Sequence, residues 1–90
     1  MIIYLVIRMK KRNDKTVEER NVEINFGKMV KNLRSKFNYT QNDIANKTNL
    51  TTQTISTIEN HGQNVGIGTI KLFAMAFDMT ISEMFSYLEE

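Results

Sequence analysis

Few side chains in this sequence could do covalent chemistry. It has no cysteine and a single histidine, His61, so neither a thiolate cluster nor a pair of histidines is available to hold a metal ion. The paired carboxylates, at positions 18–19 and 89–90, are neighbours in the chain, and no set of nucleophile, base and orienting group accompanies them. No glycine-rich phosphate loop follows a strand. We therefore expect no enzyme, no catalytic residue, no metal site and no cofactor.

The groups that remain for recognition are amides, hydroxyls and a small excess of positive charge. Asparagine and threonine are unusually common. The base composition of the genome could explain this, but short amide and hydroxyl side chains are also groups that contact nucleic acid. Twelve Lys and Arg against ten Asp and Glu give a net charge of +2, which permits a polyanionic partner without requiring one. The charge is uneven, because residues 1–22 carry +3 and residues 23–90 carry −1.

Residues 23–90 have the pattern of consecutive helices around one core, and this pattern predicts five helices. The first helix has an apolar face of four residues at helical spacing: Phe26, Val30, Leu33 and Phe37. After a loop from His61 to Gly68, a second apolar stripe predicts another helix: Ile70, Phe73, Ala74 and Phe77. Thr80 and Glu83 then form a capping box for a last helix, with Met84 facing inward.

Two short helices joined by a tight turn lie in the middle of this series, over residues 41–48 and 52–60. Thr40 and Asp43 form a short capping box for the first of them. Asn49 accepts the left-handed conformation that ends a helix, and Thr51 caps the helix that follows. Two helices in this arrangement are typical of a helix-turn-helix, whose second helix enters the major groove of DNA.

The N-terminal 22 residues are predicted to be a basic arm, separate from the domain of residues 23–90. The β-branched run from Met1 to Ile7 predicts a short strand. Its partner is either residues 16–24, folded back as a hairpin, or the same strand of a second chain; a disordered tail is the alternative. The run precedes its positive charges, so it is not a secretory signal, and it is too short to cross a membrane. We therefore expect a cytoplasmic protein that does not act at a membrane.

The stretch from Thr40 to Asn60 resembles the phage Cro and repressor type of helix-turn-helix protein, also called the xenobiotic-response-element family. The agreements carrying this resemblance are Thr40-Gln41, Ile44-Ala45, Ile55-Ser56 and Ile58-Glu59, with Phe26-Gly27, Arg34, Thr69-Ile70, Ala74, Ala76 and Ile81 outside the motif. The resemblance implies an all-α fold, a compact five-helix lambda-repressor-like domain, to which the N-terminal strand or hairpin arm is added. Three features depart from the family pattern. Asn49 and His61 stand where glycine is usual, and the recognition helix lacks Arg and Lys.

The resemblance also implies roles for single residues. Thr52, Gln53 and Thr57 match positions that read base edges, and Gln53 is the best candidate because an amide can pair bidentately with adenine. For the two threonines, a solvated helix surface is an alternative. Gln41 matches a phosphate-bracing glutamine, with support of the helix cap as the alternative, and Arg34 and Glu59 match a structural salt bridge. The remaining phosphate contacts are expected from lysines and polar side chains: Lys28, Lys31, Lys36, Lys47, Asn60, Gln63 and Asn64.

The function that follows is a sequence-specific transcriptional regulator of double-stranded DNA. A domain this small reads half a site, so a homodimer on a pseudo-palindromic operator is expected, with half-sites about 34–36 Å apart. Controller proteins of restriction-modification systems and Cro-like repressors resemble it in size. The alternative is an antitoxin or another interaction module of the same fold, whose main partner is a protein such as a toxin or a polymerase.

Overall fold

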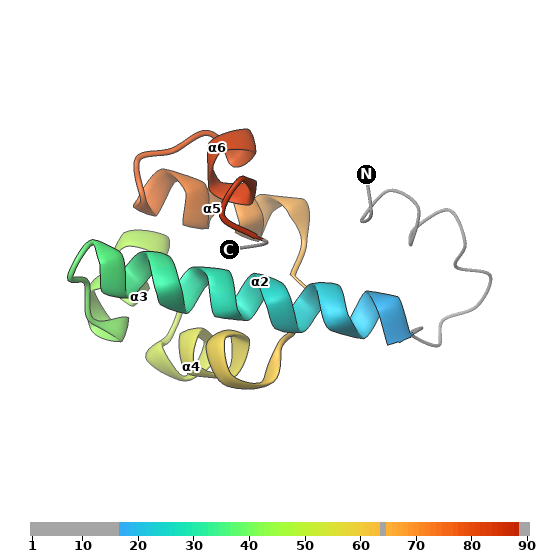
Figure 1. Cartoon of the computed structure of the whole chain (residues 1–90). Coiled ribbons are helices and arrows are strands. Elements are labelled where there is room, and N and C mark those ends of the chain that lie inside the picture. Colours follow the sequence, from blue (N-terminus) through green and yellow to red (C-terminus); the bar gives the residue numbers. More distant parts are fainter. Residues whose placement is uncertain (1–16, 64, 89–90) are drawn as a thin grey trace.

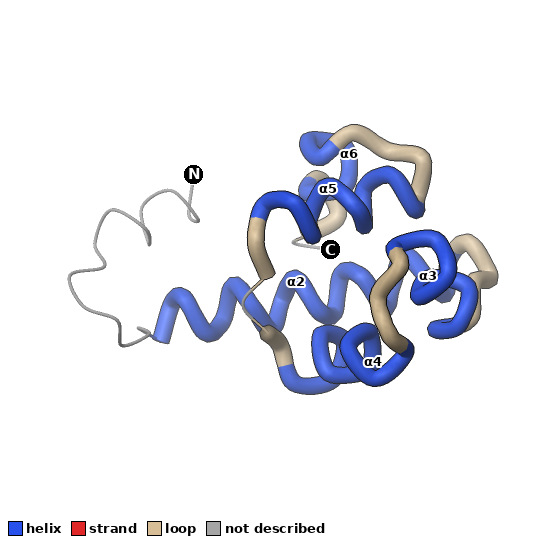
Figure 2. The backbone as a smooth tube through the Cα atoms, turned by 180° about the vertical axis from the view of Figure 1, so that it is seen from behind, coloured by secondary structure: helices blue, strands red, loops and turns tan. Residues whose placement is uncertain are grey.

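The computed structural model describes residues 17–63 and 65–88, and the described chain is helical. The helices are α2 (Val17–Lys36), α3 (Gln41–Thr48), α4 (Thr52–His61), α5 (Ile67–Ala76) and α6 (Ile81–Phe85). No strand occurs in these two described stretches (Figure 2). The all-α prediction is therefore confirmed, whereas the strand predicted for Met1–Ile7 lies outside the described residues.

Helix α2 is the axis on which the other helices pack. In Figure 1 α4 lies along one side of α2, α5 and α6 lie along the other, and the N-terminal turns of α2 extend beyond them. The predicted start at residue 23 is wrong, because α2 is helical from Val17. The predicted arm therefore includes the first turns of this helix, and residues 17–24 are helical and do not form the second strand of the predicted hairpin. Glu18 and Glu19 in the first turn favour the helix, because carboxylates there complement its dipole.

The core forms where α2 meets the four shorter helices. Nine large apolar side chains pack there with almost no exposed surface: Phe26, Met29, Val30, Leu33, Ile44, Ile55, Ile58, Phe73 and Met84. The Phe26 ring meets the Phe73 ring edge to face, with centroids 5.8 Å apart, a favourable aromatic geometry. The predicted inward faces of the helices are thus largely confirmed.

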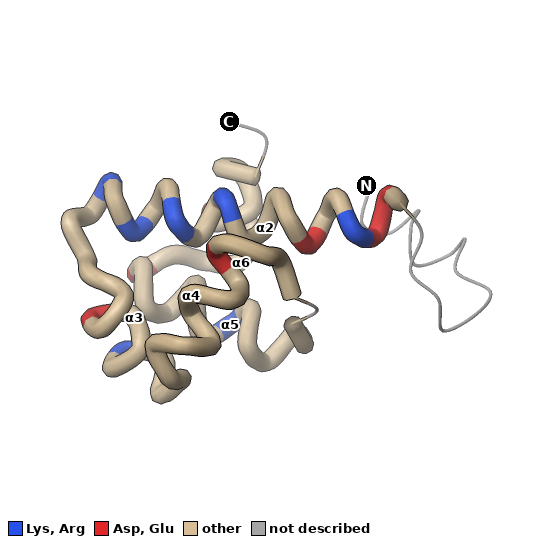
Figure 3. Tube along the Cα trace, turned by 90° about the horizontal axis from the view of Figure 1, so that it is seen from below, with Lys and Arg blue, Asp and Glu red and all other residues tan. Residues whose placement is uncertain are grey.

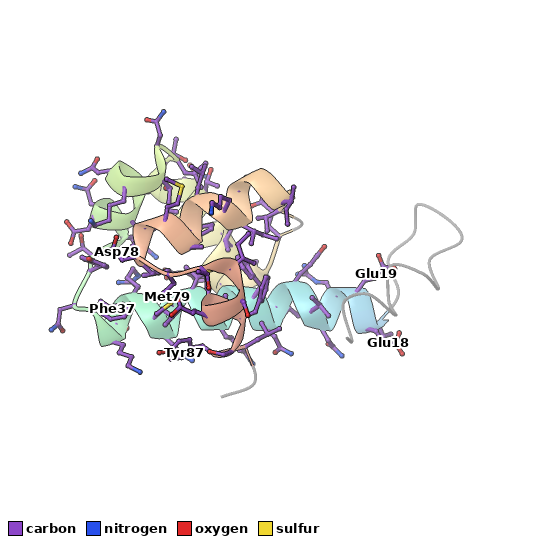
Figure 4. All side chains as sticks on the ribbon, turned by 90° about the horizontal axis from the view of Figure 1, so that it is seen from above. Glu18, Glu19, Phe37, Asp78, Met79 and Tyr87 are labelled. Atoms are coloured by element: carbon purple, nitrogen blue, oxygen red, sulfur yellow. The ribbon has the colours of Figure 1, made fainter. Side chains whose placement is uncertain are left out.

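Phe37 is an exception to these predictions. It was expected on the buried face of the first helix, yet α2 ends at Lys36 and Phe37 is 40% exposed. The N–H of Phe37 still bonds the carbonyl of Leu33, and Asn38, with a φ of 60°, then ends the helix in a left-handed conformation. The Phe37 ring instead packs on the rings of Tyr39 and Phe77, at the end of the molecule opposite Glu18 and Glu19 (Figure 4).

The predicted helix caps are confirmed. Thr40 with Asp43, and Thr80 with Glu83, form capping boxes in which each side chain bonds the backbone N–H of the other residue. Thr51 caps α4 by accepting a hydrogen bond from the backbone N–H of Thr54. The loop predicted from His61 to Gly68 is shorter at both ends, because α4 includes His61 and α5 begins at Ile67.

Candidate nucleic-acid interface

A three-residue turn joins α3 to α4 and sets the angle between them. Asn49, the C-cap of α3, has φ 62° and ψ 23°, the left-handed conformation that the sequence predicted. The buried Thr48 hydroxyl donates to the carbonyl of Ile44 at 2.7 Å and accepts from the backbone N–H of Leu50 at 3.3 Å. These bonds tie the turn to α3, so the two helices form one rigid unit.

Both helices of this unit begin with backbone N–H groups available to an outside acceptor. The first N–H groups of an α-helix have no carbonyl partner within the helix. The caps occupy those of Asp43 and Thr54, which leaves the N–H groups of Gln41 and Asn42 on α3 and of Thr52 and Gln53 on α4. Because the helix dipole also makes this end positive, each start favours an anion such as a DNA phosphate.

A buried ion pair holds α4 against α2. Arg34 donates from Nε and Nη2 to the two carboxylate oxygens of Glu59, at 2.8 and 3.1 Å. The Glu59 side chain is fully buried and Arg34 is 17% exposed. The third donor of Arg34, Nη1, reaches the carbonyl of Tyr39 at 3.0 Å and so ties in the start of α3. The salt bridge that the resemblance implied is therefore present, and the Glu59 hydrogen bond raises the pKa of Arg34 above its ordinary value.

Gln41 belongs to this buried network. Its side-chain amide nitrogen donates to Oε1 of Glu59 at 3.1 Å. This bond uses one of the two N–H donors of the amide, so the second N–H and the backbone N–H of Gln41 are the groups left for the predicted phosphate contact. Gln41 also does more than support a cap, because it links the first turn of α3 to α4.

Two glycines let α2 and α4 approach each other closely. A Cβ added at Gly27 would lie 2.0 Å from the carbonyl oxygen of Ile58, which is far inside contact distance. A Cβ added at Gly62, whose φ is +72°, would lie 3.0 Å from the backbone nitrogen of Ile24. The backbone of α4 thus rests directly on that of α2, and this contact fixes the direction in which α4 presents its outer face.

The outer face of α4 is uncharged. Gln53 is exposed, and its side-chain amide has no hydrogen-bond partner among residues 17–63 and 65–88. The Thr57 hydroxyl donates to the carbonyl of Gln53 at 2.9 Å, which leaves its methyl group and its oxygen lone pairs for contacts outside the helix. The amide nitrogen of Asn60 donates to the Ser56 hydroxyl oxygen at 3.1 Å. The face therefore offers amide and methyl groups to a partner, with Gln53 the least constrained.

A polar hollow of about 880 Å³ opens beside this face, where the end of α2 meets the starts of α3 and α4. Its lining residues are Arg34, Ser35, Asn38, Tyr39, Thr40, Gln41, Asn42 and Thr52. The sequence predictions included Gln41 and Thr52 but missed Ser35, Asn38 and Asn42 as candidate contacts. Asn42 could have been found, because it is the second residue of a predicted helix start; the other two depend on how the chain turns after α2.

Figure 3 marks the basic positions along α2, and the helical spacing shows on which side of the helix each lysine lies. Lys28 and Lys31 are exposed, and Lys31 lies about 60° around the helix from Arg34, on the flank next to α4. Lys36 lies about 200° from Arg34, and its ammonium group stands 4.8 Å from the centre of the Tyr87 ring. The spacing therefore places Lys31 on the α4 side of α2 and Lys36 on the far side, with Lys28, about 120° from Arg34, between these two directions.

The other predicted phosphate contacts also differ in position. Lys47, at the end of α3, lies over the Tyr39 ring at 5.0 Å, about 140° around the helix from Asn42. Gln63 is exposed in the loop after α4, and Asn64 lies outside the described residues. Three of the predicted side chains share the outer face of α4: Gln53, Thr57 and Asn60. Lys31 lies on the flank of α2 next to α4, whereas Lys47 lies on the side of α3 away from Asn42.

The described part of the chain contains no group of three or more His, Cys, Asp or Glu residues able to hold a metal ion. None of its helices has the length and apolar character needed to cross a membrane.

Comparison with known proteins adds to this geometry. A family model described as Helix-turn-helix matches residues 30–84, which is more than half of the chain. Comparison with curated protein sequences gives no match. Among solved structures, the chain is similar to the restriction-modification controller protein C.AhdI from Aeromonas hydrophila, with a TM-score of 0.66 and 25% identity over 72% of this chain and 97% of that one. It is also similar to the controller protein C.Esp1396I, with a TM-score of 0.69 and 26% identity over 76% of this chain and 88% of that one.

Proposed function

The chain belongs to the Cro/C1-type helix-turn-helix family of DNA-binding transcriptional regulators, and we propose that it binds a specific operator as a homodimer, with α4 in the major groove. The observation that carries this proposal is the outer face of α4. There the Gln53 amide is exposed and free of partners among the described residues, directly beside two helix starts that favour phosphate. An amide in this position matches the donor and acceptor of an adenine edge.

The division of labour within the site follows from its chemistry. Gln53, with Thr57 and Thr52 beside it, reads bases, because amide and methyl groups distinguish base pairs in the major groove. The backbone N–H groups at the starts of α3 and α4, together with Lys28 and Lys31, contact phosphates and set the register of the protein on the duplex. Arg34, Glu59 and Gln41 hold these parts in place from behind.

A homodimer is proposed because one α4 face covers only half of a typical operator. Two copies related by a two-fold axis would place their recognition helices in successive major grooves, about 34–36 Å apart, on a pseudo-palindrome. The two similar structures are controller proteins of restriction-modification systems, which supports a regulator of that class.

The test is a fluorescence-anisotropy titration of the full chain with duplexes that cover the DNA upstream of its own gene. We expect saturable binding to one duplex at low salt, weaker binding to a shuffled duplex of the same composition, and two chains per duplex by light scattering. The absence of binding to every upstream duplex at low salt would refute the proposal. A stable complex with the product of a neighbouring gene, in place of DNA binding, would favour the protein-interaction alternative.

A further inference from the structure

The first turns of α2 lie against the C-terminal end of α4. The two helices run in opposite directions, since Gly27 approaches Ile58 while residues nearer the start of α2 approach Gly62. At this end Arg20 donates from Nη2 to the carbonyl oxygen of His61 and from Nη1 to that of Gly62, the latter at 3.4 Å. Its Nη1 also pairs with Glu23 Oε1 at 3.2 Å. One guanidinium group thus bridges α2 to the last residue of α4 and to its C-cap.

These contacts meet a particular need of α4. The last carbonyls of a helix have no N–H partner within it, and the dipole makes this end negative. The last turn of α4 has no Lys or Arg, and its basic residue is His61. Arg20 supplies a positive charge from outside the helix, and its planar guanidinium holds its donors in a fixed fork that meets two successive carbonyls, whereas the donors of a lysine ammonium have no such fixed geometry.

We propose that Arg20 is a positioning residue for DNA binding: it fixes the C-terminal turn of α4 and the start of the following loop in the orientation that the bound state requires. The proposal rests on the proposed function of α4. Arg20 lies outside residues 30–84, which the family model matches. The part of α2 that precedes the matched region therefore also supports the recognition helix. The side chain keeps 44% of its surface exposed, so its loss leaves no cavity in the core.

Geometry separates this role from a direct phosphate contact. A residue that neutralises a phosphate contributes about 0.9 to the salt dependence of binding, because a condensed counterion is released. In this structure the guanidinium group is bonded to the two carbonyls and to Glu23. A positioning role therefore predicts weaker binding with an unchanged salt slope.

The experiment compares the full chain with Arg20→Ala and Arg20→Lys, using Asn21→Ala as a matched control on the exposed side of the same turn. Hydrogen exchange of the amides of residues 58–63, measured without DNA, should become about two- to fivefold faster in Arg20→Ala, the size expected for losing a cation at a helix C-terminus. Affinity for the operator should fall by about the same factor, with the salt slope unchanged. Arg20→Lys should recover part of both effects, because it keeps the charge but loses the fork, and Asn21→Ala should change neither.

Three results would overturn the proposal. Unchanged exchange in residues 58–63 would show that Arg20 does not hold the end of α4. Faster exchange with unchanged operator affinity would show a contact that stabilises the fold only. A salt slope reduced by about 0.9 per subunit would make Arg20 a phosphate contact. Failure of the proposed function is distinguishable, because the unaltered chain would then bind no operator while the exchange measurement would still report on the contact.

Discussion

Breaking the Arg34–Glu59 pair from the arginine side should be among the most damaging single changes in this protein. Arg34→Met keeps an unbranched side chain of about the size of the arginine stem but removes the three nitrogen donors that reach Glu59 and Tyr39. The Glu59 carboxylate, whose side chain is fully buried, would keep only the amide of Gln41 as a side-chain donor in the described network. An unpaired charge would then remain in the interface between α2 and α4.

The size of the effect follows from this burial. Removing one partner of a buried ion pair costs about 3–5 kcal/mol of unfolding free energy, and the 17% exposure of Arg34 favours the lower end, about 3 kcal/mol. In a domain of this length that loss lowers the melting temperature by about 12 °C or more. Glu59→Gln should cost less, about 1–2 kcal/mol, because it removes the buried charge and leaves Arg34 partly in contact with water.

A double-mutant cycle measured by urea unfolding, with helical circular dichroism as the signal, tests this reasoning. The double variant Arg34→Met with Glu59→Gln should be more stable than Arg34→Met alone, since no uncompensated carboxylate remains. If Arg34→Met cost less than 1 kcal/mol, or if the two changes were simply additive, the pair would not be the buried, coupled interaction that the distances describe. Asn32→Ala, on the exposed side of α2, provides the control and should leave stability unchanged or slightly raised.

Four further changes test the site and its support. Gln53→Ala should weaken operator binding by about 1–3 kcal/mol and leave binding to random DNA nearly unchanged in anisotropy titrations; equal losses on both would make Gln53 a phosphate contact. Lys31→Ala should lower the salt slope of binding by about 0.9 per subunit and Lys36→Ala should not, so equal slopes in the two variants would contradict their placement on opposite sides of α2. Gly27→Ala should destabilise the fold by about 1–3 kcal/mol in urea unfolding, although alanine favours helices, because its Cβ meets the Ile58 carbonyl; a more stable variant would refute that contact. The hydrogen bond from the Thr40 backbone N–H lowers the pKa of Asp43, so the Asp43 carboxylate stabilises the fold fully above about pH 4 and loses this effect as the pH falls further. Asp43→Asn should therefore make the free energy of unfolding depend less on pH in the acid range. An unchanged pH dependence in this variant would contradict the capping role of Asp43.

The features that could be predicted from the sequence are those governed by neighbouring residues. Thr40, Thr51 and Thr80 cap helices because their side chains bond N–H groups three residues away, and Asn49 ends a helix through its own backbone conformation. The apolar spacing of α2 likewise identified its buried face. Helix caps and apolar spacing depend on residues that are close in the sequence, so they can be predicted without knowing how the rest of the chain packs.

The features that the sequence did not reveal have a common physical cause. The partner that a side chain meets, and the extent of a helix without an apolar stripe, depend on tertiary structure. The first turns of α2 lack an apolar stripe of the kind that marked residues 26–33, so their helical state could not be read from periodicity. Composition identified Lys36 and Lys47 as cations but not the tyrosine rings that they cover. The phosphate contact of Gln41 stays a prediction, but nothing in the sequence indicated that its amide also contacts Glu59, which is 18 residues away.

The charge distribution sets what kind of DNA binding this protein can have. Non-specific affinity scales with the number of phosphates neutralised, and the described part of α2 has the exposed Lys31 on its α4 side, beside an uncharged recognition face. Arg34 and Arg20 add little to it, because their guanidinium groups are bonded to Glu59 and to the end of α4. In the proposed homodimer, base contacts and the joint binding of two subunits would therefore supply a larger share of operator affinity than in a domain whose recognition helix carries arginine. If the proposed function holds, discrimination between operator and random DNA by residues 17–63 and 65–88 should persist as salt is raised, since few of their cations are left to contact phosphate.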